Sequence, residues 1–98
     1  MKKKFDIGRL LTTASVFSQM QENMDFGKFV MSSLERYRKC DWGDTNEDDA
    51  LMNDDAVACG DRILASYVFK DNDGNTENVW IITESDRSAT TILFPHEY

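Results

Sequence analysis

Apolar and polar residues alternate along the last third of the chain, and this alternation predicts β-strands. Successive side chains of a strand point to opposite faces, so a strand at about 62–70 presents one uniformly apolar face. That face consists of Ile63, Ala65, Tyr67 and Phe69. Two more runs rich in β-branched and aromatic residues predict strands at about 78–83 and 89–94.

The connections between these strands are short and consist of turn-forming residues. Residues 71–75 read Asp-Asn-Asp-Gly-Asn, and residues 84–88 read Glu-Ser-Asp-Arg-Ser. Short connections join antiparallel neighbours, so we expect a three-stranded antiparallel meander. Such a sheet has open edges, and pairing of two edges in a homodimer remains an alternative to a monomer.

Residues before this sheet show helical periodicity instead. Thr12 and Thr13 are suitable N-caps for a helix over about 14–22, and Asp25 is suitable for a second helix that runs to about residue 40. An apolar stripe at helical spacing defines the inner face of the second helix. It consists of Phe26, Phe29, Val30, Leu34 and Tyr37.

A third helix is predicted over about 46–59. Thr45 followed by Asp48 fits a capping pattern, and Gly60 can end the helix in a left-handed conformation. Its expected inner face consists of Ala50, Leu51, Val57 and Ala58. The fold class is therefore α+β, in which two to three N-terminal helices (about 13–59) cover one face of a C-terminal sheet (about 62–94).

We expect residues 1–98 to form one domain, in which residues 1–12 add a short strand or an extended arm on the core. The domain has a strongly uneven charge distribution. Its formal net charge is −7, but residues 1–40 hold eight bases and four acids, whereas residues 41–98 hold three bases and fourteen acids. Such a field repels nucleic acid and attracts basic protein surfaces.

Cysteine and histidine usage supports neither a zinc site nor any other bound cofactor. Cys40 and Cys59 form no closely spaced pair, and the chain contains one histidine, His96. We expect both cysteines to be small, buried or half-buried side chains in a reducing, cytoplasmic setting. No apolar run reaches the length of about 18 residues that a membrane span requires, so no membrane partner is expected.

Acidic residues without intervening bases form a band from residue 41 to residue 61. Carboxylates along a helix can imitate a phosphate backbone and so bind a nucleic-acid-binding protein, or they can form a solvated face that aids solubility. Both interpretations remain open. The band consists of Asp41, Asp44, Glu47, Asp48, Asp49, Asp54, Asp55 and Asp61.

The connection at 83–88 has two interpretations as well. Glu84, Asp86 and Arg87 can form a contact loop for a partner, or the turn can satisfy itself through local hydrogen bonds, with Arg87 paired to a nearby carboxylate. A small metal-dependent enzyme built from Asp41, Asp44, Glu84 and Asp86 is the alternative from another class, although no nucleophile–base pair accompanies these carboxylates.

The two tryptophans are expected to lie in different surroundings. Trp80 lies within a strand, and we expect it in the core. Trp42 lies in a polar turn, where it either covers the helix ends or forms an exposed anchor for a partner. Tryptophan is favoured at interface hot spots, but burial is the preferred interpretation.

Several motifs carry a resemblance to a known family. They are Asp41-Trp42-Gly43-Asp44, Arg62-Ile63-Leu64 with Ser66-Tyr67, Trp80-Ile81-Ile82-Thr83-Glu84, Asp86-Arg87-Ser88 and Thr90-Thr91-Ile92-Leu93 with Pro95. The pattern, over roughly residues 40–98, resembles a family of small, uncharacterised proteins carried by plasmids, phages and other mobile elements. Asp61 departs from it where a second glycine often follows Gly60, and so does the longer turn at 71–78.

The resemblance implies a genetic setting rather than a chemistry. Small acidic proteins of mobile elements are often inhibitors of host defence, so it implies an anti-CRISPR or anti-restriction protein that binds a basic, nucleic-acid-binding effector. No catalytic residue is expected. Besides the enzyme, an adaptor for plasmid maintenance remains an alternative.

Overall fold

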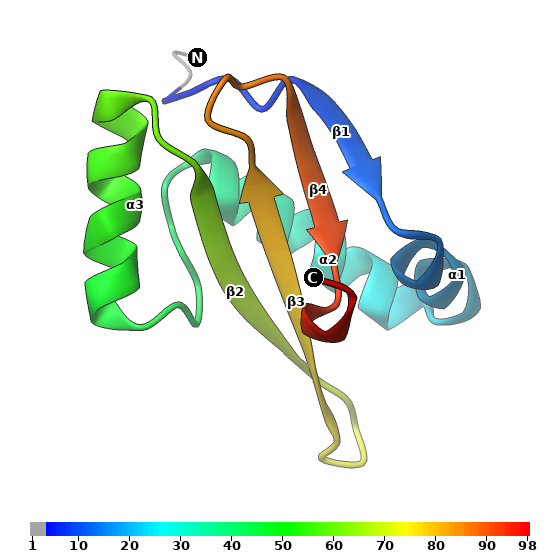
Figure 1. Cartoon of the computed structure of the whole chain (residues 1–98). Helices are drawn as coiled ribbons and strands as arrows, with labels where there is room; N and C mark the ends of the chain where they lie inside the picture. Colours follow the sequence, from blue (N-terminus) through cyan, green and yellow to red (C-terminus); the bar gives the residue numbers. More distant parts are fainter. Residues whose placement is uncertain (1–3) are drawn as a thin grey trace.

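The computed structural model describes residues 4–98 and has an α+β fold, with helices and a four-stranded mixed sheet (Figure 1). The first helix lies where the sequence predicts it, behind a Thr13 N-cap, and the other boundaries move by a few residues. In chain order the elements are β1 (Arg9–Thr12), α1 (Ala14–Glu22), α2 (Met24–Arg38), α3 (Glu47–Cys59), β2 (Ile63–Lys70), β3 (Thr76–Thr83), β4 (Ala89–Leu93) and the 3-10 helix η1 (Pro95–Glu97).

The sheet has the order β1-β4-β3-β2, and the expectation of three purely antiparallel strands is wrong. The β2–β3 and β3–β4 pairs are antiparallel as predicted, but β1 adds a fourth strand parallel to β4. Gly8 permits this addition. Its φ is +63°, and a Cβ there would lie 2.3 Å from the Arg87 carbonyl oxygen, so the chain passes the β3–β4 turn only with glycine at this position.

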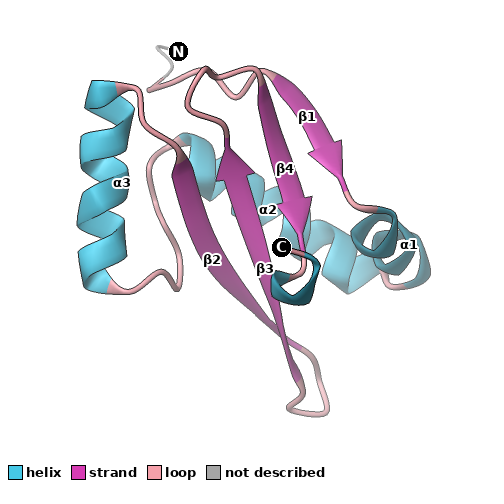
Figure 2. Ribbon diagram, viewed as in Figure 1, coloured by secondary structure: helices cyan, strands magenta, loops and turns pink. Residues whose placement is uncertain are grey.

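The core lies between the sheet and α2, which Figure 2 shows behind the strands. The predicted α2 stripe faces the sheet: Phe26, Val30 and Tyr37 are fully buried, and Phe29 is half-buried. Asn23 caps this helix by accepting a hydrogen bond from the Phe26 N–H, so the Asp25 cap is wrong by two residues. The sheet meets the helix with Ile63, Ala65 and Tyr67 of the predicted β2 face, and with residues of β3 and β4 that were not predicted to face it, Val79, Ile81 and Ile92.

A line of hydroxyl groups crosses this core. The Tyr37 and Thr83 hydroxyls are 2.7 Å apart, as are those of Thr83 and Thr90, and Thr90 donates to the Ile7 carbonyl at 2.6 Å. Burial raises the pKa of Tyr37, so its phenol stays protonated. The line therefore ties α2, β3, β4 and the N-terminal segment together without leaving a buried hydroxyl unpaired.

The prediction that two to three helices cover one face of the sheet is wrong for α3. Figure 1 shows α3 beside β2, at the edge of the sheet, rather than over its face. Leu51 and Ala58, expected inside, are exposed, whereas Asn53 and Ala56 are buried. Asn46 caps this helix through the Asp49 N–H in place of Thr45, while Gly60 ends it with φ +81° as predicted.

Trp80 is not in the core, because its strand turns the neighbouring residues inward. Val79, Ile81 and Thr83 are fully buried against α2, so Trp80 lies on the opposite sheet face and is half-buried. There it packs edge-to-face on Tyr98, with 5.7 Å between ring centroids, and the Arg62 guanidinium lies 4.9 Å from the centre of the Tyr98 ring. This face carries η1 and no long helix (Figure 1).

Candidate functional site

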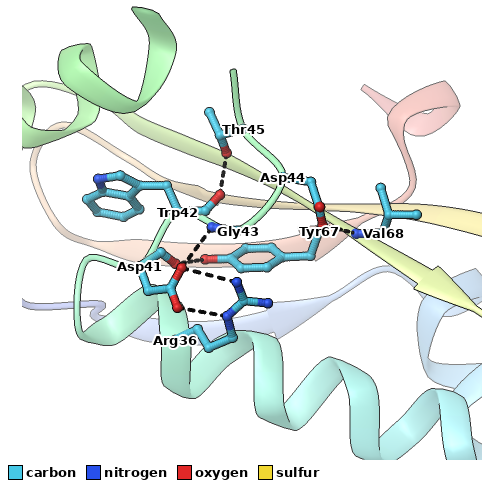
Figure 3. A network of polar contacts seen from close by, with 8 residues as sticks. All are labelled: Arg36, Asp41, Trp42, Gly43, Asp44, Thr45, Tyr67 and Val68. Atoms are coloured by element: carbon cyan, nitrogen blue, oxygen red, sulfur yellow. Dashed lines mark hydrogen bonds and ion pairs between the residues drawn. The ribbon is translucent and has the colours of Figure 1, made fainter. Parts of the chain in front are cut away.

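The acidic part of the chain begins with the segment between α2 and α3. The first carboxylate of this segment, that of Asp41, is held in place by Arg36 of α2. Asp41 forms a two-pronged ion pair with Arg36, at 2.9 Å to Nε and 3.1 Å to Nη2, and accepts from the Gly43 N–H (Figure 3). The hydrogen bonds from Arg36, then that from Gly43, lower the pKa of Asp41. This carboxylate is exposed and charged, and it already has a partner.

Asp44 and Thr45, farther along this segment, bind the outer edge of β2. Asp44 accepts from the Val68 N–H at 2.8 Å, and its own N–H donates to the Ser66 carbonyl at 2.8 Å. The Thr45 hydroxyl accepts from the Ser66 N–H at 2.8 Å. It donates to the Trp42 carbonyl at 2.6 Å (Figure 3). These groups take the place of a neighbouring strand.

Asn53 on α3 completes the cover of this edge. Its side-chain amide donates to the Leu64 carbonyl at 2.8 Å and accepts from the Leu64 N–H at 3.3 Å. The backbone N–H and carbonyl groups of Leu64 and Ser66 and the Val68 N–H therefore have partners on this side, so this part of β2 is not the open edge that a three-stranded sheet predicts. Homodimer formation itself stays a prediction.

Trp42 is buried, as preferred from the sequence, with 6% of its surface exposed. Its ring packs edge-to-face on Tyr37 at 5.5 Å, and its Nε1 donates to Asp54 at 2.9 Å. Phe5 of the N-terminal segment lies against both rings. Trp42 thus links α2 to α3, and its indole is not an exposed anchor in this conformation.

Acidic and apolar side chains share the exposed surface of α3. Glu47, Asp48, Asp49 and Asp55 are exposed as expected, and Asp49 accepts from the Asn46 side-chain amide at 3.0 Å. Among them stand two apolar residues with most of their surface in solvent, Leu51 (59% exposed) and Met52 (66% exposed). The predicted acidic band is therefore a mixed acidic and apolar surface, and the apolar part was missed because Leu51 was expected inside.

The β3–β4 connection contacts the end of α3. Glu84 and Asp86 are exposed, and hydrogen bonds from the Ser88 side chain and backbone lower the pKa of Asp86. Arg87 has φ +62°, and its guanidinium donates to the Ala56 carbonyl at 2.9 Å and the Asp61 carbonyl at 2.7 Å. Arg87 was expected to pair with a carboxylate, but its partners are backbone carbonyls. Two lie at the C-terminal end of α3, where the helix dipole favours a cation, and two are the local carbonyls of Glu84 and Ser85, at 3.2 and 3.5 Å.

A groove of about 280 Å³ lies between α3 and β2, and sequence reasoning missed it entirely. Met52, Ala56 and Leu64 supply its apolar lining, and Asn53 lines it between helix and strand. The charged lining residues are Asp49, Asp61 and Arg62. The sequence signal for it is an apolar run, Ala50-Leu51-Met52, between the acids at 47–49 and those at 54–55.

The carboxylates of the enzyme alternative do not come together as a metal site. Asp41 and Asp44 lie along β2, with Arg36 and the Val68 N–H as partners, whereas Glu84 and Asp86 belong to the β3–β4 connection. Within residues 4–98, no three His, Cys, Asp or Glu side chains are grouped so that they could hold a metal ion.

Of the two cysteines, Cys40 is half-buried as predicted, but Cys59 is exposed, because it lies on the outward side of α3. Burial raises the pKa of the Cys40 thiol. Over the described residues, 4–98, none of the helices combines the length and apolar character needed to cross a membrane.

Comparison of the chain with protein family models, curated proteins and solved structures yields no match.

Proposed function

We propose that the chain is a small acidic protein-binding module that contacts a basic partner protein through the outward side of α3. One observation carries the proposal: Leu51 is 59% exposed and has Asp48 and Asp55 as its neighbours on the helix surface, at i−3 and i+4. Apolar residues exposed beside charges of one sign suit a protein surface with an apolar contact and complementary charge.

This surface favours a mixed protein contact over close mimicry of a phosphate backbone. Asp48 and Asp55 are separated by about 10 Å along the helix axis at ~1.5 Å per residue. Duplex DNA carries one charge about every 1.7 Å of its axis, with both strands counted. We therefore expect the acids to guide and orient the partner, and Leu51 to supply contact area.

The partner we propose is a nucleic-acid-binding protein, since such proteins present clustered lysine and arginine. Following the resemblance of the motifs to proteins of mobile elements, we place the module in the cytoplasm as an inhibitor of a host defence protein, of the anti-CRISPR or anti-restriction type. Occupation of the basic surface would then exclude nucleic acid from it.

Affinity capture from a bacterial lysate at low and at moderate salt tests the proposal. The wild-type chain should retain nucleic-acid-binding proteins that duplex DNA displaces, and the D48K/D55K variant should retain at least about fivefold less of them. The matched control, E22K/D73K, makes the same change in net charge on exposed residues of α1 and the β2–β3 turn. Equal capture by both variants and the wild type, or capture that salt and DNA do not affect, contradicts the proposal.

A further inference from the structure

The groove between α3 and β2 has an apolar centre and acidic ends. Met52, Ala56 and Leu64 line the middle, and Met52 is the most exposed of them, at 66%. Asp49 lines the groove near the start of α3, and Asp61 lines it just beyond the helix C-terminus. A bound chain would therefore meet a carboxylate, then apolar surface, then a second carboxylate.

The charges of the lining favour a basic occupant. Two carboxylates face one guanidinium, that of Arg62, which lies over the Tyr98 ring at 4.9 Å. The Asp61 backbone is engaged, since its N–H donates to the Ala56 carbonyl and its carbonyl accepts from Arg87. These backbone bonds fix the position from which the exposed Asp61 carboxylate projects.

The dimensions of the groove indicate how long the occupant is. The helix rises ~15 Å over the ten residues that follow Asp49. An extended peptide advances about 3.3 Å per residue, so about five residues span that distance. The volume of about 280 Å³ lies just below the usual range for small-molecule sites, about 300–1,000 Å³, and suits one or two side chains rather than a cofactor.

We infer that this groove receives an extended segment of the partner protein in which one large apolar residue stands between two basic residues, each two positions away. The apolar side chain packs against Met52 and Leu64, and the basic side chains pair with Asp49 and Asp61. The inference rests on the proposed function, because it identifies the part of the partner that the acidic module recognises.

Titration of the isotopically labelled chain with three synthetic peptides, followed by two-dimensional NMR, tests this. Arg-Ser-Leu-Ser-Arg, with blocked termini, should produce saturable shifts of the Met52, Ala56 and Leu64 amide signals. Arg-Ser-Ser-Ser-Arg, which lacks the apolar residue, and Glu-Ser-Leu-Ser-Glu, which reverses the charges, should produce neither saturation nor shifts at these three positions.

Variants of exposed side chains provide the controls, since they leave the core intact. Met52→Ser should weaken binding of the first peptide severalfold, and Asp61→Asn should weaken it about two- to fivefold, the range of a surface ion pair. Met31→Ser on α2, where the methionine is also exposed, should change nothing. Equal shifts with all three peptides, or an unchanged affinity of the Met52→Ser variant, overturn the inference.

The two proposals can fail separately. If the peptides leave the groove unperturbed while D48K/D55K still abolishes capture, the groove inference is wrong and the module contacts its partner through α3 alone. If capture is also indifferent to charge reversal, both are wrong.

Discussion

α2 and α3 have similar lengths, 15 and 13 residues, but different kinds of contact hold them to the sheet. α2 buries Phe26, Val30 and Tyr37 completely, and each such side chain contributes about 1.5–3 kcal/mol by leaving water. α3 buries only Asn53 and Ala56. α3 shows that a helix can be held in a fixed position although it buries few apolar side chains.

Directional hydrogen bonds position α3 instead. The Asn53 amide pairs with the Leu64 backbone, Asp54 accepts from the Trp42 indole, and the Ala56 carbonyl accepts from Arg87. These contacts lie on or beside the inner side of the helix. The larger apolar residues Leu51 and Met52 are therefore free to face outward, which makes α3 the better candidate for binding and α2 the scaffold.

Truncation of one large side chain on each helix gives the largest expected contrast. Phe26→Ala should lower the free energy of unfolding by about 3–5 kcal/mol, because it opens a cavity among Phe29, Phe69 and Phe94. Leu51→Ala should change it by no more than about 0.5 kcal/mol, since the side chain is already in solvent. Urea unfolding of both variants measures the difference, and a large cost for Leu51→Ala would mean that α3 is held by apolar packing after all.

Removal of the Asn53 amide should loosen α3 selectively. Asn53→Ala leaves the Leu64 N–H and carbonyl without their partners, at a cost of about 1–2 kcal/mol, and water entering the groove limits that cost. Hydrogen exchange of the Leu64 amide should accelerate, while exchange of the buried Val30 amide in α2 should follow only the change in global stability. Parallel acceleration at both amides would show that the two helices unfold as one unit.

Neutralisation of Asp41, in the segment that joins the helices, should have the smallest effect. The pKa of this carboxyl is lowered in the folded chain, so its contribution is complete above the ordinary value of about 3.9 and disappears as the pH falls through the lowered value. Asp41→Asn should therefore cost about 0.5 kcal/mol at pH 7, a figure reduced for the 53% exposure of the side chain, and less as the pH falls toward 2.

Thermal unfolding at both pH values measures this difference, with Asp73→Asn as the matched control. Asp73 lies in the exposed β2–β3 turn, and its replacement should leave stability unchanged at either pH. A cost of Asp41→Asn that is as large at pH 2 as at pH 7 would mean that steric fit, rather than charge, fixes the carboxylate.

Elements with a strong local pattern could be predicted from the sequence. The apolar stripe of α2, the alternation of β2 and the turns at 71–75 and 84–88 all depend on residues near one another in the chain. β1 could not be predicted with the same certainty, because four residues carry little periodicity and their partner strand begins at Ala89. Its addition depends on Gly8 meeting the Arg87–Ser88 backbone, a contact between distant segments.

Only part of the candidate site could be predicted, because its other features depend on contacts between distant segments. The exposed acids of α3 follow from composition, but the rotation of the helix does not, because an asparagine rather than an apolar side chain faces the strand. The groove is a consequence of that rotation. Arg87 shows the same limit: its sequence neighbours suggest a local carboxylate partner, whereas the tertiary structure offers helix carbonyls.

The parallel pairing of β1 with β4 has a consequence for how the molecule is made. Arg9 pairs with Ala89, about eighty residues later, and the Thr13 hydroxyl donates to Glu97. Contacts between segments so distant in sequence slow folding, because the intervening loop must close first. During synthesis on the ribosome, β1 emerges before β4, so the β1–β4 pair cannot form until the roughly eighty residues between them have been made.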